Sequence, residues 1–389
     1  MLASAPLQAS SPFAAAWTTP AILLASLLMT WGAESAQFFV AQGFALAILA
    51  WMQTMPEFAV EAVLAWHQKT PLLIANLTGA IRLLTGLAWP MIYATAAYAH
   101  RLRTGRPLRK IALDPHHSME VIALFCPLVY SFAIWWKGAL DIYDAIILTA
   151  IYAVYLFLLT RLPPEEGETI EDLELVPRKI ALAPRRWRIL GITACFVLGA
   201  ALIYFTAEPF LGSLIALATA IGVPTFVVIQ WFAPVISEFP EIVSTFYFAR
   251  QSGNASVALM NIASSNINQW TLLMAMLPVT FSLSRGAPAS IPLDAEQQSE
   301  LLLTIAQSCV ILIFLLDMEI AWWEAASMFA LFAAQFILPP FIGKQAGLWI
   351  TSIFFFWVAA AILRLIVRKR RPEALRKFTE LWREHVTRS

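Results

Sequence analysis

Apolar runs long enough to cross a lipid bilayer recur along the whole chain, and they constrain its fold more than any other feature. A helix of about 20 apolar residues spans the hydrocarbon core of a membrane. With 60% hydrophobic and only 13% charged residues among 389, the chain does not fit a soluble enzyme carried by one anchor helix. We therefore predict an all-α polytopic membrane protein. The expected spans are 20–33, 36–67, 71–99, 118–136, 141–161, 188–206, 210–250, 254–283, 300–318, 321–339 and 346–367.

Two of these eleven runs, 36–67 and 210–250, are too long for one straight helix. Both contain proline, which removes a backbone hydrogen bond and kinks or ends a helix. We expect both spans to be broken or kinked at their prolines, which are Pro56 in the first and Pro224, Pro234 and Pro240 in the second.

The basic residues predict the orientation, because Lys and Arg in short loops stay on the cytoplasmic side. With the N-terminus outside, 21 of the 26 basic residues fall in cytoplasmic segments, including the linker 162–187 and the C-terminal tail. Residues 1–19 carry no Lys or Arg and are expected to form a tail rather than a secretory signal peptide. A bacterial inner membrane suits this pattern.

A short motif occurs twice and indicates an internal repeat. Thr54-Met55-Pro56-Glu57 is followed 19 residues later by Asn76, and Glu238-Phe239-Pro240-Glu241 is followed 20 residues later by Asn261. We interpret 20–161 and 188–339 as two copies of five spans each. Because five is odd, the copies have opposite orientations in the membrane. Residues 340–389 then form one extra transmembrane helix and a basic cytoplasmic tail.

The chemistry of the motif favours cation binding. Proline frees a carbonyl oxygen and glutamate adds an anionic one, and hard cations prefer oxygen ligands. Glu61 lies one turn after Glu57, and Glu238 lies one turn before Glu241, so four carboxyls could converge. Four close carboxylates need cations or protons to coexist. Neutral oxygen donors are Thr54 and Asn76 in the first copy and Asn261, Ser265 and Gln269 in the second. The alternative is that the neutral side chains only join helices by hydrogen bonds.

The paired motifs resemble the α-repeats of the calcium/cation antiporter superfamily, whose type member is the sodium/calcium exchanger. The resemblance implies that Glu57 and Glu241 bind the metal ion, that Thr54, Ser265 and Gln269 take the places of family ligands, and that a sliding two-helix bundle opens each side in turn. The first copy departs from the family pattern. Ala80 stands in place of a serine and Leu84 in place of an asparagine.

We accordingly predict a secondary active antiporter that exchanges Ca²⁺ or a related cation against Na⁺ or H⁺. It is expected to act on cations in the bilayer without a cofactor, not as an enzyme, and not on nucleic acid. Arg82 lies in the same span as Ala80 and Leu84, about 120° around the helix from them. If it reached Glu61, its charge would substitute for one bound cation. The alternatives are a transport-inactive membrane scaffold and, less favoured, an intramembrane hydrolase. The oligomeric state is left open.

Overall fold

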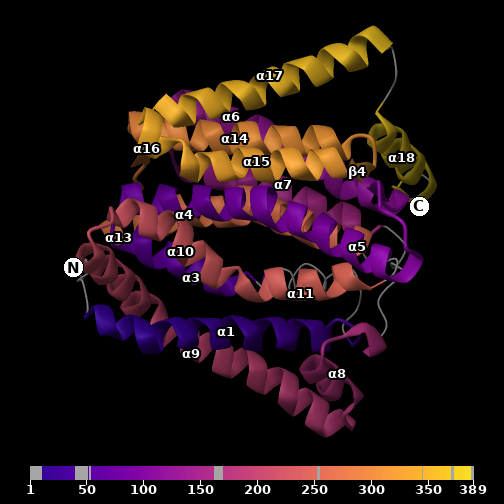
Figure 1. Ribbon diagram of the computed structural model, residues 1–389. Coiled ribbons are helices and arrows are strands. Elements are labelled where there is room, and N and C mark those ends of the chain that lie inside the picture. The colour runs from indigo at the N-terminus through magenta and orange to yellow at the C-terminus, as the bar shows by residue number, and fades with distance from the viewer. Residues whose placement is uncertain are drawn as a thin grey trace.

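A computed structural model describes residues 11–39, 51, 54–161, 170–251, 255–343, 345–368 and 372–386, and almost all of this part of the chain is helical (Figure 1). Within these residues, seven helices are long and apolar enough to cross a membrane. An eighth span is obtained if the bent pair Thr225–Ser237 and Glu241–Arg250 is counted as one. The fold is therefore a polytopic α-helical membrane protein, as predicted.

The described helices divide into a first half and a second half, in which similar elements follow one another in similar order. The first half is α1 (Ala15–Ala36), α3 (Met55–Trp66), α4 (Thr70–Leu83), η2 (Leu84–Ala88), α5 (Trp89–Thr104), α6 (Ser118–Lys137) and α7 (Ile142–Leu159). The second half is α9 (Arg185–Ile221), α10 (Thr225–Ser237), α11 (Phe239–Arg250), α12 (Ala255–Asn268), η5 (Gln269–Leu273), α13 (Met274–Arg285), α14 (Ala295–Leu315) and α15 (Trp322–Ile337).

Shorter elements connect and extend the two halves. The linker contains η4 (Ile170–Asp172) and α8 (Leu175–Leu182), and the C-terminal part contains α16 (Pro339–Ile342), α17 (Gln345–Arg368), α18 (Glu373–Leu381) and η6 (Trp382–Val386). The remaining turns are η1 (Pro12–Ala14) and η3 (Pro115–His117). In Figure 1, α1 begins on the left and runs along the bundle, and α18 lies on the right, so the start of α1 and α18 are at opposite ends of the bundle.

One predicted boundary is wrong. We expected a break at 206–210, but α9 runs without interruption through Pro209 and ends only at Gly222, whose φ is +70°. A proline inside a membrane helix is tolerated where its surroundings satisfy the freed carbonyl. The left-handed conformation that glycine adopts easily is what ends this helix. The following span starts at Thr225, after Pro224.

Two short strand ladders tie the halves together in a reciprocal way. Strand β1 (Lys110–Ala112) pairs with β4 (Glu319–Ala321), and β2 (Ala139–Leu140) pairs with β3 (Ile291–Pro292). Strands β1 and β3 follow the third span of their respective halves, and β2 and β4 follow the fourth. Exchanging the two halves therefore converts one ladder into the other, which is the relation that an inverted repeat requires.

The helices form two groups. Helices α1 and α9 pack along each other and lie together on one side of the bundle, whereas the remaining spans form a larger group (Figure 1). At the contact between them, a Cβ added to Gly199 of α9 would lie 2.9 Å from the sulfur of Met29 on α1. The two helices therefore approach closely and form one unit.

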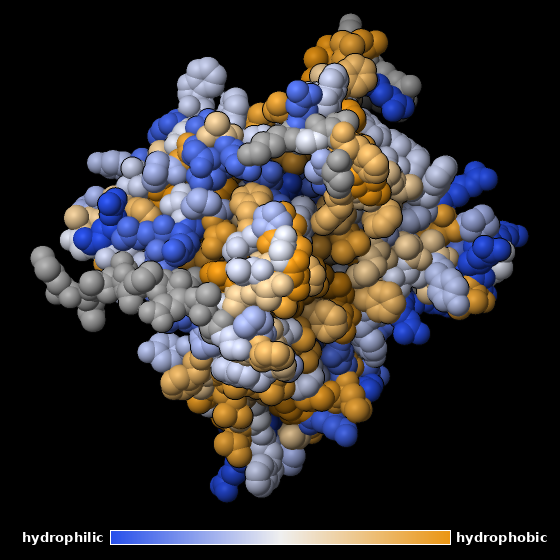
Figure 2. All heavy atoms as spheres, turned by 60° about the vertical axis from the view of Figure 1, so that its left-hand side comes forward, coloured by the Kyte–Doolittle hydropathy of each residue, from blue (hydrophilic) through white to orange (hydrophobic). Residues whose placement is uncertain are grey.

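The outer surface is that of a protein surrounded by lipid. Large apolar side chains such as Tyr204, Phe205 and Phe356 are more than 70% exposed. Figure 2 shows apolar side chains gathered over the centre of one face, with hydrophilic ones toward its margins. Exposed apolar surface of this extent is expected where hydrocarbon replaces water as the solvent.

Candidate cation site

The centre of the candidate site is formed by two helix starts, one in each half. Helix α3 begins at Met55 with Pro56 in its first turn, and α11 begins at Phe239 with Pro240 in its first turn. The axes of α10 and α11 differ by 59° across the break between them. Proline is well suited to the start of a helix because its missing N–H would have no partner there. The bend between α10 and α11 confirms a break in the second long span. In the first, residues 40–50 and 52–53 of the expected span 36–67 lie outside the described residues, and the structure gives only the start of α3 at Met55. Each helix start places a glutamate in the first turn.

The structure brings four carboxyl groups together at these breaks. Glu57, Glu61 and Glu238 are at most 2% exposed, and Glu241 is half-buried. Glu57 lies within electrostatic range of Glu61, Glu238 and Glu241. Neither oxygen of Glu57 accepts a hydrogen bond within the described part of the chain, and the same holds for Glu61 Oε2. Buried carboxylates without donors are costly unless a cation or a proton neutralises them.

Neutral side chains from the neighbouring spans surround the carboxyls. Asn76 Nδ2 donates to Glu61 Oε1 at 2.9 Å, and Gln269 Nε2 donates to Glu238 Oε1 at 2.8 Å. Ser265 Oγ donates to Glu241 Oε2 at 3.1 Å. The amide oxygens of Asn76 and Gln269 are buried and accept no hydrogen bond from any described residue. These oxygens are therefore available as ligands next to the carboxyls.

Asn268, which is adjacent to the predicted stripe of Asn261, Ser265 and Gln269 but was not selected as a ligand, belongs to this cluster. Its Nδ2 donates to Thr54 Oγ1 at 2.7 Å and so joins α12 to the start of α3. Asn261, which we did select, is half-buried on α12 and makes no side-chain hydrogen bond to the carboxyls in the described structure. The signal that could have pointed to Asn268 is its position beside Gln269, immediately before the π-helical segment η5. A π-turn adds a residue to the helix and is frequent at functional sites.

The two halves contribute different numbers of polar side chains to the candidate site. The segments η2 and η5 are both π-helical and begin at the corresponding residues Leu84 and Gln269. Ala80 and Leu84 are fully buried apolar residues where the second half has Ser265 and Gln269. The first half therefore supplies Asn76 but no further polar side chain on this stripe.

Arg82 does not pair with Glu61. Its Nη2 lies 2.5 Å from Glu300 Oε2, its Nη1 donates to Gln335 Oε1 at 3.2 Å, and its guanidinium lies 5.0 Å from the centre of the Trp231 ring. Gln230 also donates to Glu300 Oε2, at 2.8 Å. Arg82 therefore pairs with a carboxylate other than Glu61, and its charge does not substitute for a cation at Glu61. The charge of Arg82 is balanced by a glutamate 218 residues away.

The donor set determines which ions the site could hold. Among the described residues, no group of three or more His, Cys, Asp or Glu side chains is arranged to hold a metal ion by itself. A cation here would have to combine the carboxylates with amide, hydroxyl or backbone oxygens. Such mixed oxygen sets suit hard cations such as Ca²⁺ more than Zn²⁺.

Comparison with known proteins gives similarities over nearly the whole chain. A family model described as sodium/calcium exchanger protein matches residues 10–161 and 191–338. The crystal structure of a protein described as the H⁺/Ca²⁺ exchanger CAX is similar, with 30% identity, a TM-score of 0.85, and coverage of 96% of this chain and 92% of that chain.

More distant structures share the fold. Two structures of the sodium-calcium exchanger NCX_Mj have 16% and 14% identity and TM-scores of 0.54 and 0.56. They cover 85% and 83% of this chain and 97% and 96% of their own chains. No curated protein matches the sequence significantly.

Proposed function

This chain belongs to the sodium/calcium exchanger family, and from that premise we propose that it is a secondary active antiporter that moves Ca²⁺ or a related cation against H⁺. The observation that carries the proposal is the convergence of Glu57, Glu61, Glu238 and Glu241 at the two proline breaks. Their charges repel one another when no cation is present, so that binding of a divalent ion and binding of protons are alternative ways to neutralise them.

We favour H⁺ over Na⁺ as the counter-ion because of the first half of the chain. Each bound Na⁺ needs several oxygen ligands, and Ala80 and Leu84 remove two candidates. A proton needs only one carboxyl oxygen. The similarity to a protein described as an H⁺/Ca²⁺ exchanger, at 30% identity, supports the same choice. Na⁺ coupling remains the competing version.

Alternating access would come from movement of the pair α1 and α9 along the larger helix group. The close contact of Gly199 with α1 lets the two helices move as one body. We place the N-terminus outside and the C-terminus in the cytoplasm of a bacterial inner membrane, which is supported by the segregation of 21 of the 26 basic residues. A reporter that is active only in the cytoplasm, fused after Ser389, tests this orientation.

The transport proposal is tested by flux in proteoliposomes. Ca²⁺ uptake is measured under an imposed pH gradient, an imposed Na⁺ gradient, and neither, for the wild type and for Glu57→Gln and Glu241→Gln. We expect uptake to follow the pH gradient and to fall by at least about 100-fold in both variants, because each removes a charge that the ion needs. Glu380→Gln, an exposed position on α18, is the matched control and should transport normally.

The same samples separate the alternatives. Uptake that follows the Na⁺ gradient alone would replace H⁺ by Na⁺ in the proposal. A transport-inactive scaffold, for which Ala80 and Leu84 argue, would show no flux under either gradient. In that case Ca²⁺ would also leave the thermal stability of the wild type and of both variants unchanged, and the antiporter proposal would be wrong.

A further inference from the structure

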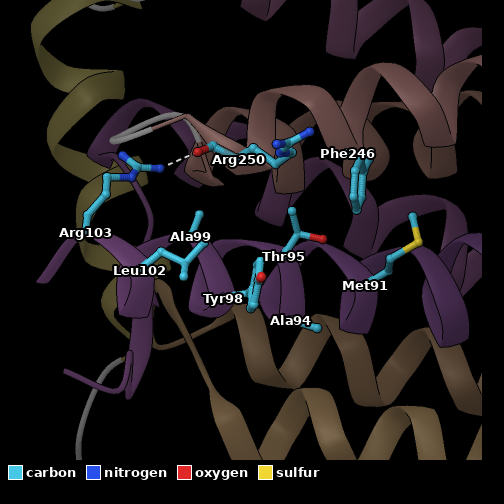
Figure 3. Close-up of a pocket in the computed structure, with 9 residues that line it drawn as sticks. All are labelled: Met91, Ala94, Thr95, Tyr98, Ala99, Leu102, Arg103, Phe246 and Arg250. Atoms are coloured by element: carbon cyan, nitrogen blue, oxygen red, sulfur yellow. Dashed lines mark hydrogen bonds between the residues drawn. The ribbon is translucent and has the colours of Figure 1, made fainter. Parts of the chain in front are cut away.

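A groove between α5 and α11 lies outside the carboxyl cluster and has a different chemistry. Its volume is about 530 Å³, and it follows one face of α5 from Met91 to Leu102. Figure 3 shows Thr95 and Met91 of α5 pointing toward α11, and Phe246 of α11 pointing back toward α5. The groove is therefore a slot between two helices and runs along their length.

The length and the lining of the groove suit a hydrocarbon chain. The twelve helical residues from Met91 to Leu102 are separated by eleven rises and extend about 16 Å, which matches the roughly 15 Å of hydrocarbon in one bilayer leaflet. Apart from Thr95 and two arginines, the lining consists of apolar or aromatic residues. Tyr98 and Leu102 are 68% and 70% exposed, so the groove is open to the surroundings along its side.

Positive charge is confined to one end of the groove. Arg103 ends the α5 side and Arg250 ends the α11 side, and both are exposed. The guanidinium of Arg103 donates to the backbone carbonyl of Arg250, which holds the two helix ends together (Figure 3). None of the nine lining residues is acidic. Two guanidinium groups repel a cation and match a phosphate group.

From this combination we propose that the groove binds one anionic phospholipid. An acyl chain lies between α5 and α11, and the phosphate is held by Arg103 and Arg250. In the orientation proposed above, these arginines lie at the cytoplasmic end together with 21 of the 26 basic residues, where anionic lipid of the cytoplasmic leaflet is expected. Glu241 lies in the first turn of the same helix that Arg250 ends. A lipid in the groove therefore braces the helix that positions one of the four carboxyls.

Lipid binding is measured on the full-length protein in detergent after removal of lipid. Phosphatidylglycerol and phosphatidylcholine with identical acyl chains are added, and the thermal denaturation midpoint is followed against lipid concentration. We expect phosphatidylglycerol to raise the midpoint and phosphatidylcholine to have little effect. In Arg103→Gln/Arg250→Gln, half-maximal stabilisation should need about 25-fold more phosphatidylglycerol, at about fivefold for each basic residue.

Two further variants separate a built site from general attraction. Arg101→Gln/Arg106→Gln removes two exposed charges at the same helix end that do not line the groove, and its response should stay within about threefold of the wild type. Ala99→Phe fills the groove and keeps both arginines, and should abolish the stabilisation. If Ala99→Phe does not fold, the phosphatidylglycerol that co-purifies with the arginine variants, counted by mass spectrometry, decides.

Three results would overturn the proposal. They are equal stabilisation by both lipids, an equal loss in the control pair and the groove pair, and an undiminished response of a folded Ala99→Phe. All of these readouts are independent of ion flux. Failure of the lipid proposal is therefore distinguishable from failure of the antiporter proposal.

Discussion

Replacement of Gly79 by alanine tests the helix contact on which the site depends. Helices α4 and α10 meet at Gly79, where an added Cβ would lie only 1.8 Å from the backbone oxygen of Gln230. An ordinary C···O contact is about 3.3 Å, so the two backbones must separate by about 1.5 Å. A flexible side chain could move aside, but a helix backbone cannot do so without carrying its neighbours.

The expected cost exceeds the benefit of alanine in a helix. Alanine is better than glycine in a helix interior by about 0.5–1 kcal/mol, whereas overpacking of a close contact costs about 1–3 kcal/mol. The net cost therefore lies between about 0 and 2.5 kcal/mol. Because the clash is with backbone rather than with a flexible side chain, we expect Gly79→Ala to be destabilised by about 1–2 kcal/mol. Asn76, on the same helix, holds Glu61, and α10 leads directly into the break at Glu238. A shift near 1 Å in such a site commonly costs about 100-fold in activity.

The matched control is Gly347→Ala, which makes the same change within a helix at a position where the added Cβ meets nothing within 4 Å. Both variants are compared with the wild type in thermal denaturation, with and without Ca²⁺, and in proteoliposome flux. Gly347→Ala should be as stable as the wild type or slightly more stable, and should transport normally. If Gly79→Ala matches Gly347→Ala in all three measurements, the packing of α4 on α10 and its link to the carboxyls are refuted.

Two further predictions concern buried and exposed charge. Arg82→Met should be destabilised by about 3 kcal/mol, the lower end of the range for a broken buried ion pair, because Glu300, whose side chain is 23% exposed, loses its counter-charge. Arg82→Met/Glu300→Leu should recover much of this loss, and additive effects in a double-mutant cycle of denaturation midpoints would contradict the pairing. Partial burial favours a higher pKa for Asp141, but hydrogen bonds from Lys137 and from backbone N–H groups outweigh it and hold the pKa below the usual 3.8. Because that lowered pKa contributes stability only while Asp141 is ionised, the midpoint difference between wild type and Asp141→Asn should be constant at neutral pH and disappear as the pH falls below about 4; a difference that persists in acid would exclude this ion pair as its cause.

The repeat architecture was predictable from the sequence because each copy carries the same short local motif. Each Pro-Glu pair is a helix break and a buried charge at once, and two such pairs in long apolar runs identify corresponding positions. The family match over 10–161 and 191–338 confirms the two halves. Likewise, Asp144 and Glu324 recur at matching places, and each accepts the backbone N–H of the residue that precedes its helix, Asp141 or Ala321.

The features that were not predictable depend on contacts between residues far apart in the sequence. Asn261 and Asn268 lie two turns apart on the same face of α12, so spacing alone does not distinguish them. Only the packing of α12 against the start of α3 places Asn268 next to Thr54. The partner of Arg82 could not be found because no local pattern links it to Glu300. The continuity of α9 was missed because Pro209 is a strong helix breaker in water but not in every membrane setting.

The two short strand ladders, each joining a strand of the first half to a strand of the second, have a consequence for how the protein is made. Strand β1 is synthesised early, but more than half of the chain follows before its partner β4 is made. Strand β2 also pairs with a strand of the second half, β3, and cannot form its ladder until β3 is made. Until then, the backbone edges of the first half have no ladder partner from the second. The first half alone is therefore an unfinished product of biogenesis, and assembly is complete only when the late spans arrive and join both strands.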